Sequence, residues 1–149
     1  METDDFRLEH FLPYLLNQAA ETSSLAFQQV YRERYGILRT EWRVLFHLGL
    51  YGRMTASEIG QRARMHKTKI SRAVQRLSER RLVTRARDDQ DRRVEHLTLT
   101  AQGQAAYADL RAVAQRYDAT LLSQLSPEEG AVLRKALQKL AAVRPASFT

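Results

Sequence analysis

Apolar residues recur at spacings of three and four along most of this chain, and that spacing places them on one face of a helix. The first such run extends from Phe6 to Tyr35 and is followed by Gly36, which we expect to end the helix as a C-cap residue. Pro13 lies inside the run and predicts either a helix start nearby or a kink. At about 1.5 Å per residue, this helix is too long for a small domain to cover, so its apolar stripe predicts contact with another chain.

Two shorter helices are predicted next. Thr40 can cap the first, which extends through Leu50 and is broken at Gly52. Thr55-Ala-Ser-Glu58 has the spacing of a capping box, in which each side chain binds the other residue's free backbone N–H, and it opens the second helix. The inward side of the first of these helices is expected to consist of Trp42, Leu45, Phe46 and Gly49.

A further helix follows a turn at Met65 and His66 and has two contrasting faces. Its apolar face consists of Ile70, Ala73, Val74 and Leu77. Its opposite face is polar and largely basic, with Thr68, Lys69, Ser71, Arg72, Gln75 and Arg76. A short capped helix, a tight turn and a helix with two such faces form a helix-turn-helix, whose second helix fits the major groove of DNA. An ordinary amphipathic surface helix is the alternative interpretation.

The spacing then changes to that of strands. Leu82–Arg85 and His96–Leu99 flank a charged segment, Asp88–Arg93, which predicts a β-hairpin with a long tip. A hairpin directly after the DNA-reading helix can act as a wing, and its arginines can reach the adjacent minor groove, where negative potential is concentrated. A hydrated loop with a local ion pair is the alternative for this tip.

Two helices complete the expected fold. Thr100 can cap a helix from Ala101 to Leu125, and Ser126-Pro127-Glu128-Glu129 begins a last helix that ends near Ala142. The fold class is therefore expected to be mainly α with a small β-hairpin wing. We expect a winged helix-turn-helix DNA-binding region over residues 38–100 and dimerisation helices over 6–36 and 101–145.

Charge supports this interpretation. Of the 24 Lys and Arg residues 13 lie between Arg53 and Arg93, with only five of the 17 Asp and Glu residues, so this segment holds the whole positive excess. A concentrated positive field attracts a polyanion such as duplex DNA or RNA, although a solvated basic face would look the same. The chain has no cysteine and no apolar run of about 20 residues, which predicts a cytoplasmic protein without a membrane span.

Side-chain chemistry assigns the DNA contacts. Arg can pair with guanine and Gln with adenine through two hydrogen bonds, whereas Ser and Thr contact bases or phosphates. His66 is expected to donate to a phosphate where the reading helix begins. The predicted DNA-binding residues are Thr55, His66, Lys67, Thr68, Lys69, Ser71, Arg72, Gln75, Arg76, Asp91, Arg92 and Arg93.

The chain resembles the MarR family of bacterial transcription regulators over nearly its full length. The segments that carry the resemblance are Arg39-Thr-Glu-Trp-Arg-Val-Leu45, Thr55-Ala-Ser-Glu-Ile59, Lys67–Leu77, Arg81-Leu-Val-Thr-Arg85, Asp91-Arg-Arg93 and Leu97-Thr-Leu-Thr-Ala-Gln-Gly103. The Asp-x-Arg wing followed at a fixed distance by Leu-Thr-x-x-Gly is the most specific of these. The resemblance implies a triangular homodimer on a pseudo-palindromic operator, with Arg93 in the minor groove and Asp91 orienting it.

The resemblance also implies an effector. Many relatives release DNA when a small aromatic carboxylate or its CoA ester binds between the dimerisation and DNA-binding regions, and Phe11–Asn17 is similar to relatives that respond to hydroxycinnamates. Such a pocket needs an apolar slot and one or two donors. The candidate effector residues are Tyr14, Asn17, Arg39, Trp42, Phe46 and Arg64. Core packing for Trp42 and Phe46, and a partner-chain contact for Tyr14 and Asn17, are the simpler alternatives.

Other classes of function fit less well. The pattern shows no nucleophile elbow, no Gly-rich phosphate loop and no metal-binding helix pair, so we expect no enzyme and no cofactor. The four histidines are scattered without ligand spacing, so no metal site is expected. A winged-helix module that binds RNA or a protein partner without an effector is the main alternative. An RNA reader more typically carries stacking aromatics, which the predicted reading face lacks.

Overall fold

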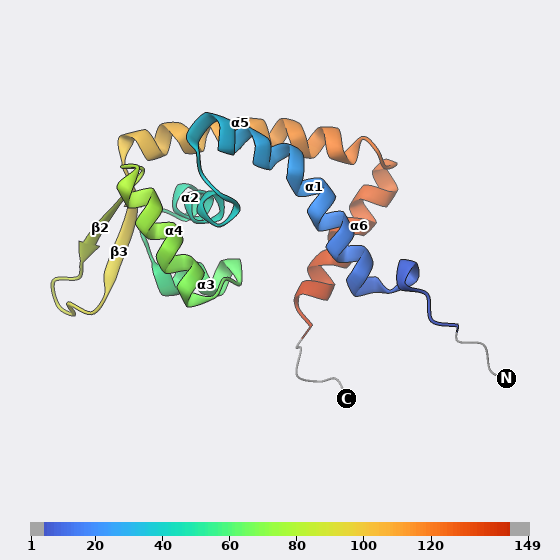
Figure 1. The fold of residues 1–149 in the computed structure, drawn as a ribbon, viewed down its shortest axis with the longest axis horizontal. Helices are drawn as coiled ribbons and strands as arrows, with labels where there is room; N and C mark the ends of the chain where they lie inside the picture. Colours follow the sequence, from blue (N-terminus) through green and yellow to red (C-terminus); the bar gives the residue numbers. More distant parts are fainter. Residues whose placement is uncertain (1–4, 144–149) are drawn as a thin grey trace. The chain divides into compact units, whose positions relative to one another are not determined.

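The computed structural model describes residues 5–143 (Figure 1). A 3-10 turn η1 (Leu8–His10) precedes the helices α1 (Leu12–Tyr35), α2 (Arg39–Tyr51), α3 (Ala56–Ala63), α4 (Lys67–Glu79), α5 (Ala101–Leu122) and α6 (Pro127–Ala141). The strands are β1 (Met54–Thr55), β2 (Val83–Arg87) and β3 (Glu95–Leu99). The expected fold class, mainly helical with a small β wing, is confirmed. No helix among the described residues combines the length and apolar character needed to cross a membrane.

The chain forms two compact units, residues 1–113 and 114–149, and their boundary falls within α5. The first unit contains every element from η1 to β3 and the first half of α5. The second contains the rest of α5 and α6.

The ends of α1 follow the local signals in the sequence, with one correction. The helix starts at Leu12 with Pro13 in its first turn, and Gly36 ends it with a left-handed φ of 63°. The expectation of a helix from Phe6 was wrong, because residues 8–10 form a separate 3-10 turn and Phe11 is extended. Pro13 accounts for this, since its fixed φ suits a first helical turn whereas its ring would break a helix interior.

Helix α2 differs from the prediction in its cap and its inward face. Thr40 does not cap it; instead the Glu41 carboxylate accepts a hydrogen bond from the Leu38 N–H at 3.2 Å. The buried side is formed by Glu41, Val44, Leu45 and Leu48, while Trp42 and Phe46 are only partly buried. The expected inward side was therefore shifted around the helix, with Leu45 alone of the predicted residues fully buried.

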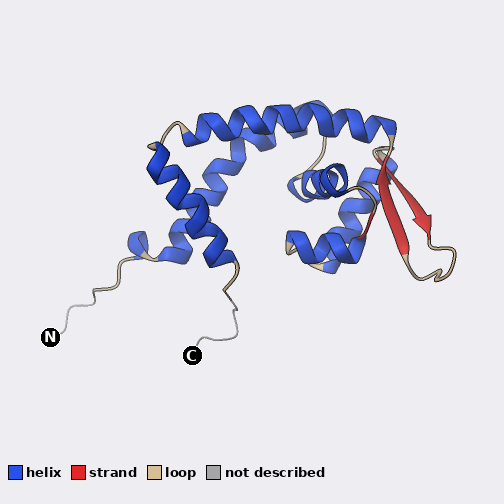
Figure 2. Ribbon diagram, turned by 180° about the vertical axis from the view of Figure 1, so that it is seen from behind, coloured by secondary structure: helices blue, strands red, loops and turns tan. Residues whose placement is uncertain are grey.

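The strands form a three-stranded antiparallel sheet in the order β1-β3-β2. Strands β2 and β3 make the predicted hairpin, which Figure 2 shows in red, with Val83 opposite Leu99 and Arg87 opposite Glu95. Strand β1 was not predicted, since its two residues are too few to show an alternating pattern. It pairs Thr55 with His96, so the middle strand of the wing is joined to the start of α3.

The core of the first unit lies along the buried face of α4. Helix α4 buries Ile70, Ala73, Val74 and Leu77, as its periodicity predicted. Helix α5 approaches the turn before β2 closely, because a Cβ on Gly103 would collide with the Leu82 carbonyl oxygen. Thr100 caps α5 as expected, accepting from the Gly103 N–H at 2.9 Å.

A polar cluster joins α1 to α5 within the first unit. Arg34 donates to both carboxylate oxygens of Asp109 at 2.9 Å, and the Tyr35 hydroxyl donates to Asp109 at 2.6 Å. Burial and this hydrogen bond raise the pKa of Tyr35 to about 12, so the hydroxyl keeps its donor proton at neutral pH.

The second unit carries the predicted start signal of the last helix. Ser126 accepts from the Glu129 N–H at 3.1 Å, and the Glu129 carboxylate accepts from the Ser126 N–H at 2.9 Å, which completes the capping box. The exposed apolar residues of α6 are Val132, Leu133, Leu137 and Leu140.

Glu41 is the one buried charged side chain of the described residues, at 1% exposure. Its carboxylate lies 3.7 Å from the Arg76 guanidinium on α4, so α2 and α4 share an ion pair at the edge of the core. Burial raises the pKa of Glu41, and the Leu38 N–H and Arg76 offset that effect only in part.

Glu41→Gln is therefore expected to change how stability depends on pH. A raised folded-state pKa means that the stability contributed by the neutral acid is complete below the ordinary value of 4.5 and is lost as the pH rises through the folded value. A glutamine stays neutral, so the wild type should lose free energy of unfolding relative to Glu41→Gln as the pH rises above 4.5. Urea unfolding across this range measures it. Glu33→Gln, on the exposed face of α1, should keep the wild-type profile, and parallel profiles for Glu41→Gln would contradict the prediction.

Candidate nucleic-acid interface

Helices α3 and α4 form the two helices of a helix-turn-helix. Thr55 caps α3 by accepting from the Glu58 N–H at 3.1 Å, as one half of the predicted box. Arg64 ends α3 in a left-handed conformation with φ 55°, and the Met65 N–H returns to the Gly60 carbonyl at 3.0 Å. His66 then caps α4, its Nδ1 accepting from the Thr68 N–H at 3.2 Å. Because Nδ1 is used inside the turn, Nε2 is the ring nitrogen of His66 that can face a ligand.

The polar face of α4 is open to solvent. All the residues predicted to bind DNA from this helix are exposed: Lys67, Thr68, Lys69, Ser71, Arg72, Gln75 and Arg76. Burial of the opposite apolar face holds the helix in this orientation. The exposed face therefore has the width and chemistry that a major groove accepts.

These side chains differ in how strongly the protein itself engages them. Gln75 donates to the Glu79 carboxylate at 2.8 Å, and Arg76 lies against buried Glu41. In the described part of the chain, no carboxylate lies within ion-pair distance of Lys67, Lys69 or Arg72. Lys67, Lys69 and Arg72 are therefore available for an anionic ligand. Arg76, in contrast, already lies against the Glu41 carboxylate.

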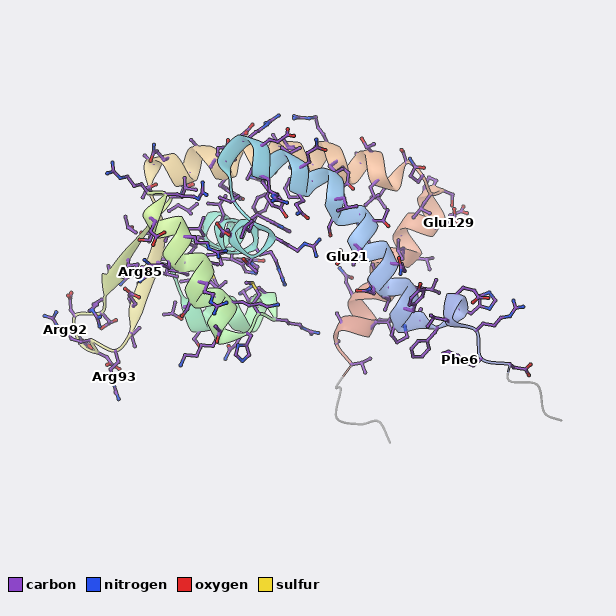
Figure 3. All side chains as sticks on the ribbon, in the orientation of Figure 1. Phe6, Glu21, Arg85, Arg92, Arg93 and Glu129 are labelled. Carbon is purple, nitrogen blue, oxygen red and sulfur yellow. The ribbon has the colours of Figure 1, made fainter. Side chains whose placement is uncertain are left out.

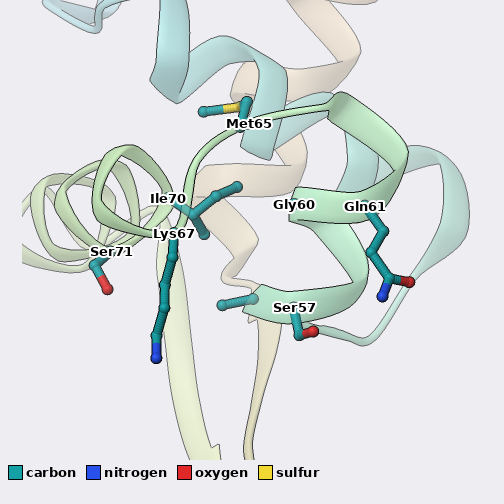
Figure 4. Close-up of a pocket in the computed structure, with 8 residues that line it drawn as sticks. Ser57, Gly60, Gln61, Met65, Lys67, Ile70 and Ser71 are labelled. Carbon is teal, nitrogen blue, oxygen red and sulfur yellow. The ribbon is translucent and has the colours of Figure 1, made fainter. Parts of the chain in front are cut away.

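A pocket of about 460 Å³ opens between α3 and the start of α4 (Figure 4). Met65 and Ile70 contribute apolar side chains to it, and the polar groups of Ser57, Gln61 and Lys67 lie around it. Sequence reasoning did not select Ser57 and Gln61. The signal that could have identified these two residues is that they are exposed polar residues on the short helix before α4.

The hairpin carries its basic residues at and near its tip. Arg92 and Arg93 project there (Figure 3), and Arg93 is 91% exposed in its side chain. Asp91 Oδ1 accepts from the Arg93 backbone N–H at 3.1 Å and from Nε at 3.2 Å. Arg87 donates to the Arg92 carbonyl at 2.7 Å. Arg85 and Arg87 are exposed on β2 and were not among the predicted contacts, although they alternate with Thr84 and Ala86 as strand residues do.

Asp88 is the most connected residue of the tip. Its Oδ1 accepts from the backbone N–H groups of Gln90 and Asp91 at 2.8 and 3.1 Å, and its Oδ2 lies 3.0 Å from Nε2 of His96. The hydrogen bond with His96 and those from the two N–H groups lower the pKa of Asp88 to about 2. Sequence reasoning missed this residue, because Asp88 and His96 are eight positions apart and are brought together only by the hairpin.

The predicted effector residues fall into three places. Trp42 and Phe46 pack edge to face at 5.2 Å between ring centroids, within a cluster that includes Phe27 and Tyr31. Arg39 borders this cluster and pairs with Glu21 at 3.2 Å.

The other three candidates lie outside the aromatic cluster. Asn17 is exposed on α1 one turn before Glu21, and Tyr14 is exposed one turn earlier. Arg64 is exposed at the end of α3, next to Ala63, whose carbonyl accepts a hydrogen bond from Arg43.

Arg39, paired with Glu21, lies next to Tyr31 at the edge of the aromatic cluster. Burial raises the pKa of Tyr31, and Arg39 acts against that shift. The tyrosine hydroxyl therefore remains a neutral donor next to a cation. Among residues 5–143, no group of three or more His, Cys, Asp or Glu side chains is placed to hold a metal ion.

A two-helix reader followed at once by a β-hairpin defines a winged helix-turn-helix protein. A family model described as the MarR family matches residues 35–94, the segment from the end of α1 to the hairpin tip. The MarR family transcriptional regulator SPO1453 from Silicibacter pomeroyi is 31% identical, with a TM-score of 0.77 over 91% of this chain and 99% of that one. The chain belongs to the MarR family.

Two further relatives are informative. The transcriptional repressor MdtR from Bacillus subtilis is 30% identical over 97 residues, which are 65% of this chain. That match spans 63% of the length of MdtR. The crystal structure of NadR in complex with 4-hydroxyphenylacetate is 26% identical, with a TM-score of 0.75 over 97% of this chain and 100% of that chain.

Proposed function

We propose that this chain is a transcription regulator, a repressor, that binds double-stranded DNA as a homodimer on a pseudo-palindromic operator. The observation that carries the proposal is the exposed polar face of α4 next to a hairpin with arginines at its tip. Two such heads read half-sites one helical turn apart, about 34–36 Å from centre to centre. Arg72 and Gln75 contact bases, Lys67 and Lys69 contact phosphates, and Arg93 enters the minor groove.

Dimerisation is supported by large apolar side chains that are exposed among the described residues. Leu8, Phe11, Leu12 and Leu15 are exposed around the start of α1, and Leu133 and Leu137 are exposed on α6. Exposed apolar stripes of this kind mark protein–protein contacts. The proposed dimerisation segments are residues 6–36 and 101–145, of which 144–145 lie outside the described residues.

A charge in the proposed interface should separate the dimer. Leu137→Glu is expected to convert a dimer at micromolar concentration into a monomer, because a carboxylate cannot be buried there without a partner. Sedimentation equilibrium measures the change. Gln138→Glu, on the same helix, should remain dimeric, and a monomeric wild type at that concentration would refute the proposal.

The DNA contacts should divide into those that recognise sequence and those that do not. Arg72→Ala should cost about 1–3 kcal/mol on a preferred site and relax preference at one base pair, while little changes on random duplex. Lys67→Ala should weaken both equally and flatten the dependence of affinity on salt. Fluorescence anisotropy on duplexes enriched from a randomised pool measures both. Arg116→Ala, exposed on α5, is the control, and an equal loss on both DNAs for Arg72→Ala contradicts the assignment.

The alternative, a module for RNA or a protein partner, is distinguished by the competitor that displaces the labelled duplex. Unlabelled duplex DNA should compete, whereas structured RNA and single strands should compete only weakly. The exposed face of α4 carries no aromatic side chain on which an unpaired base could stack, and this observation favours duplex DNA.

We also propose that an aromatic carboxylate or its CoA ester binds near Trp42 and lowers affinity for the operator. The support is the aromatic cluster with Arg39 at its edge, together with the complex of NadR with 4-hydroxyphenylacetate. A ligand acts only through its preference for one state, so it must favour a spacing of the two heads that cannot engage both half-sites. Losing one half-site loses the combined affinity of the pair.

Removing Arg39 should remove the response to the effector. With a panel of benzoates, hydroxycinnamates and their CoA esters, at least one compound is expected to displace the operator from the wild type at or below millimolar concentration. Arg39→Ala should need about tenfold more of it, the effect of losing a charge-assisted hydrogen bond. Arg64→Ala tests the second candidate cation, and Arg116→Ala serves as the control. If no compound displaces DNA, or if both variants respond like the wild type, the pocket assignment is wrong.

A further inference from the structure

The ion pair with Asp91 cannot by itself fix the direction of the Arg93 side chain. The Arg93 side chain is 91% exposed, and the Asp91 side chain is 46% exposed. An exposed ion pair contributes little, because water screens the attraction and two flexible side chains must be ordered. Asp91 can therefore orient Arg93 only if the backbone of the tip is itself held in place.

We propose that Asp88, held by His96, is the positioning residue that fixes the wing tip and thereby the direction of Arg93. This inference rests on the proposed DNA-binding function. Asp88 itself does not touch DNA. It acts on Arg93 through the backbone of the tip.

Asp88 joins the two sides of the tip through both its backbone and its carboxylate. Its N–H donates to the Val94 carbonyl at 2.8 Å, which closes the loop at its base. Its Oδ1 binds two successive backbone N–H groups, of Gln90 and Asp91, on the other side of the turn. These three hydrogen bonds determine the path of the chain from residue 88 to residue 94.

His96 connects this arrangement to the sheet. It lies on β3, the middle strand, opposite Ala86 on β2 and Thr55 on β1. Its Nε2 lies 3.0 Å from Asp88 Oδ2, and both side chains are partly buried, at 21% and 33% exposure. The carboxylate is therefore tied to the part of the wing that is paired on both sides.

A continuous series of hydrogen bonds links His96 to Arg93. His96 holds Asp88, Asp88 holds the Asp91 N–H, and the Asp91 carboxylate holds the backbone N–H and Nε of Arg93. The Asp91 carbonyl also accepts from the Val94 N–H at 3.0 Å. The low pKa of Asp88, about 2, keeps this carboxylate ionised, so the arrangement persists at physiological pH.

Simple electrostatics and a positioning role predict opposite effects on DNA affinity when Asp88 is removed. Asp88 is negative and lies close to where a polyanion would bind, so its removal alone should tighten binding. Positioning predicts weaker binding, and only while Arg93 is present. Asp89 supplies a matched control, since it is the exposed neighbour with the same charge and makes no hydrogen bond or ion pair within the described residues.

The test measures affinity for a duplex enriched from a randomised pool, prepared with A·T-rich or G·C-rich flanks, in the wild-type and Arg93→Ala backgrounds. Asp88→Ala is expected to weaken binding to the A·T-flanked duplex by about three- to tenfold, part of what a charge-assisted contact contributes. The loss should disappear in the Arg93→Ala background, and Asp89→Ala should bind as tightly as the wild type or more tightly. Asp88→Asn, which keeps an acceptor oxygen for the two N–H groups, should recover part of the loss.

Equal affinities for Asp88→Ala and Asp89→Ala, or an equal loss with and without Arg93, would overturn the proposal. A second measurement needs no DNA and separates its failure from failure of the proposed function. In the free protein, ¹⁵N relaxation at Arg93 Nε should show greater mobility in Asp88→Ala and His96→Ala than in Asp89→Ala. If all three variants match the wild type, Asp88 does not position Arg93. If the wild type binds no duplex while this difference in mobility is present, the DNA-binding function alone is wrong.

Discussion

The burial of one face of α4 is the constraint on which the rest of the first unit depends. Ile70, Ala73, Val74 and Leu77 leave water together, and each large apolar side chain contributes about 1.5–3 kcal/mol when fully buried. Because they share one face, their burial turns the polar residues of α4 outward. It also places β2, since the Leu82 N–H returns to the Leu77 carbonyl at 2.9 Å at the end of the helix. The reading face and the wing thus follow from the same packing.

The carboxylates of Glu41 and Asp88 are each linked to an arginine, but they lie in opposite environments. Glu41 is buried and its pKa is raised, whereas Asp88 is near the surface and its pKa is lowered to about 2. The first lies against Arg76 where α4 meets α2. The second organises the backbone that leads to Arg93. Glu41 contacts Arg76 directly and Asp88 is linked to Arg93 through the backbone of the tip, and both arginines are ones that the sequence alone would assign directly to DNA.

The apolar residues around the start of α1 and on α6 have a different meaning from those of the core. Leu133 and Leu137 are 44% and 40% exposed, although their spacing is that of a core face. Periodicity reports that a face will be covered but does not report by which chain. The proposed homodimer accounts for these faces, and it is also what the spacing of two DNA half-sites requires.

The sequence by itself determined the features whose energies are local. Capping at Thr55, Thr100 and Ser126, the left-handed end at Gly36, and the two faces of α4 all depend on residues within about one or two turns of each other. Membership of the family and the identity of the wing arginines likewise followed from short motifs.

Tertiary structure decided what depends on residues distant in sequence. The Glu41 carboxylate, which accepts from the nearby Leu38 N–H, also lies 3.7 Å from Arg76 on α4, and that second contact depends on how α2 and α4 pack. Arg39 is paired with Glu21, 18 positions away, and the Asp88–His96 contact exists only once the hairpin has formed. Strand β1 is too short to show any pattern and forms because β3 offers it an edge. In each case the interaction depends on distances set by packing, which residue spacing does not contain.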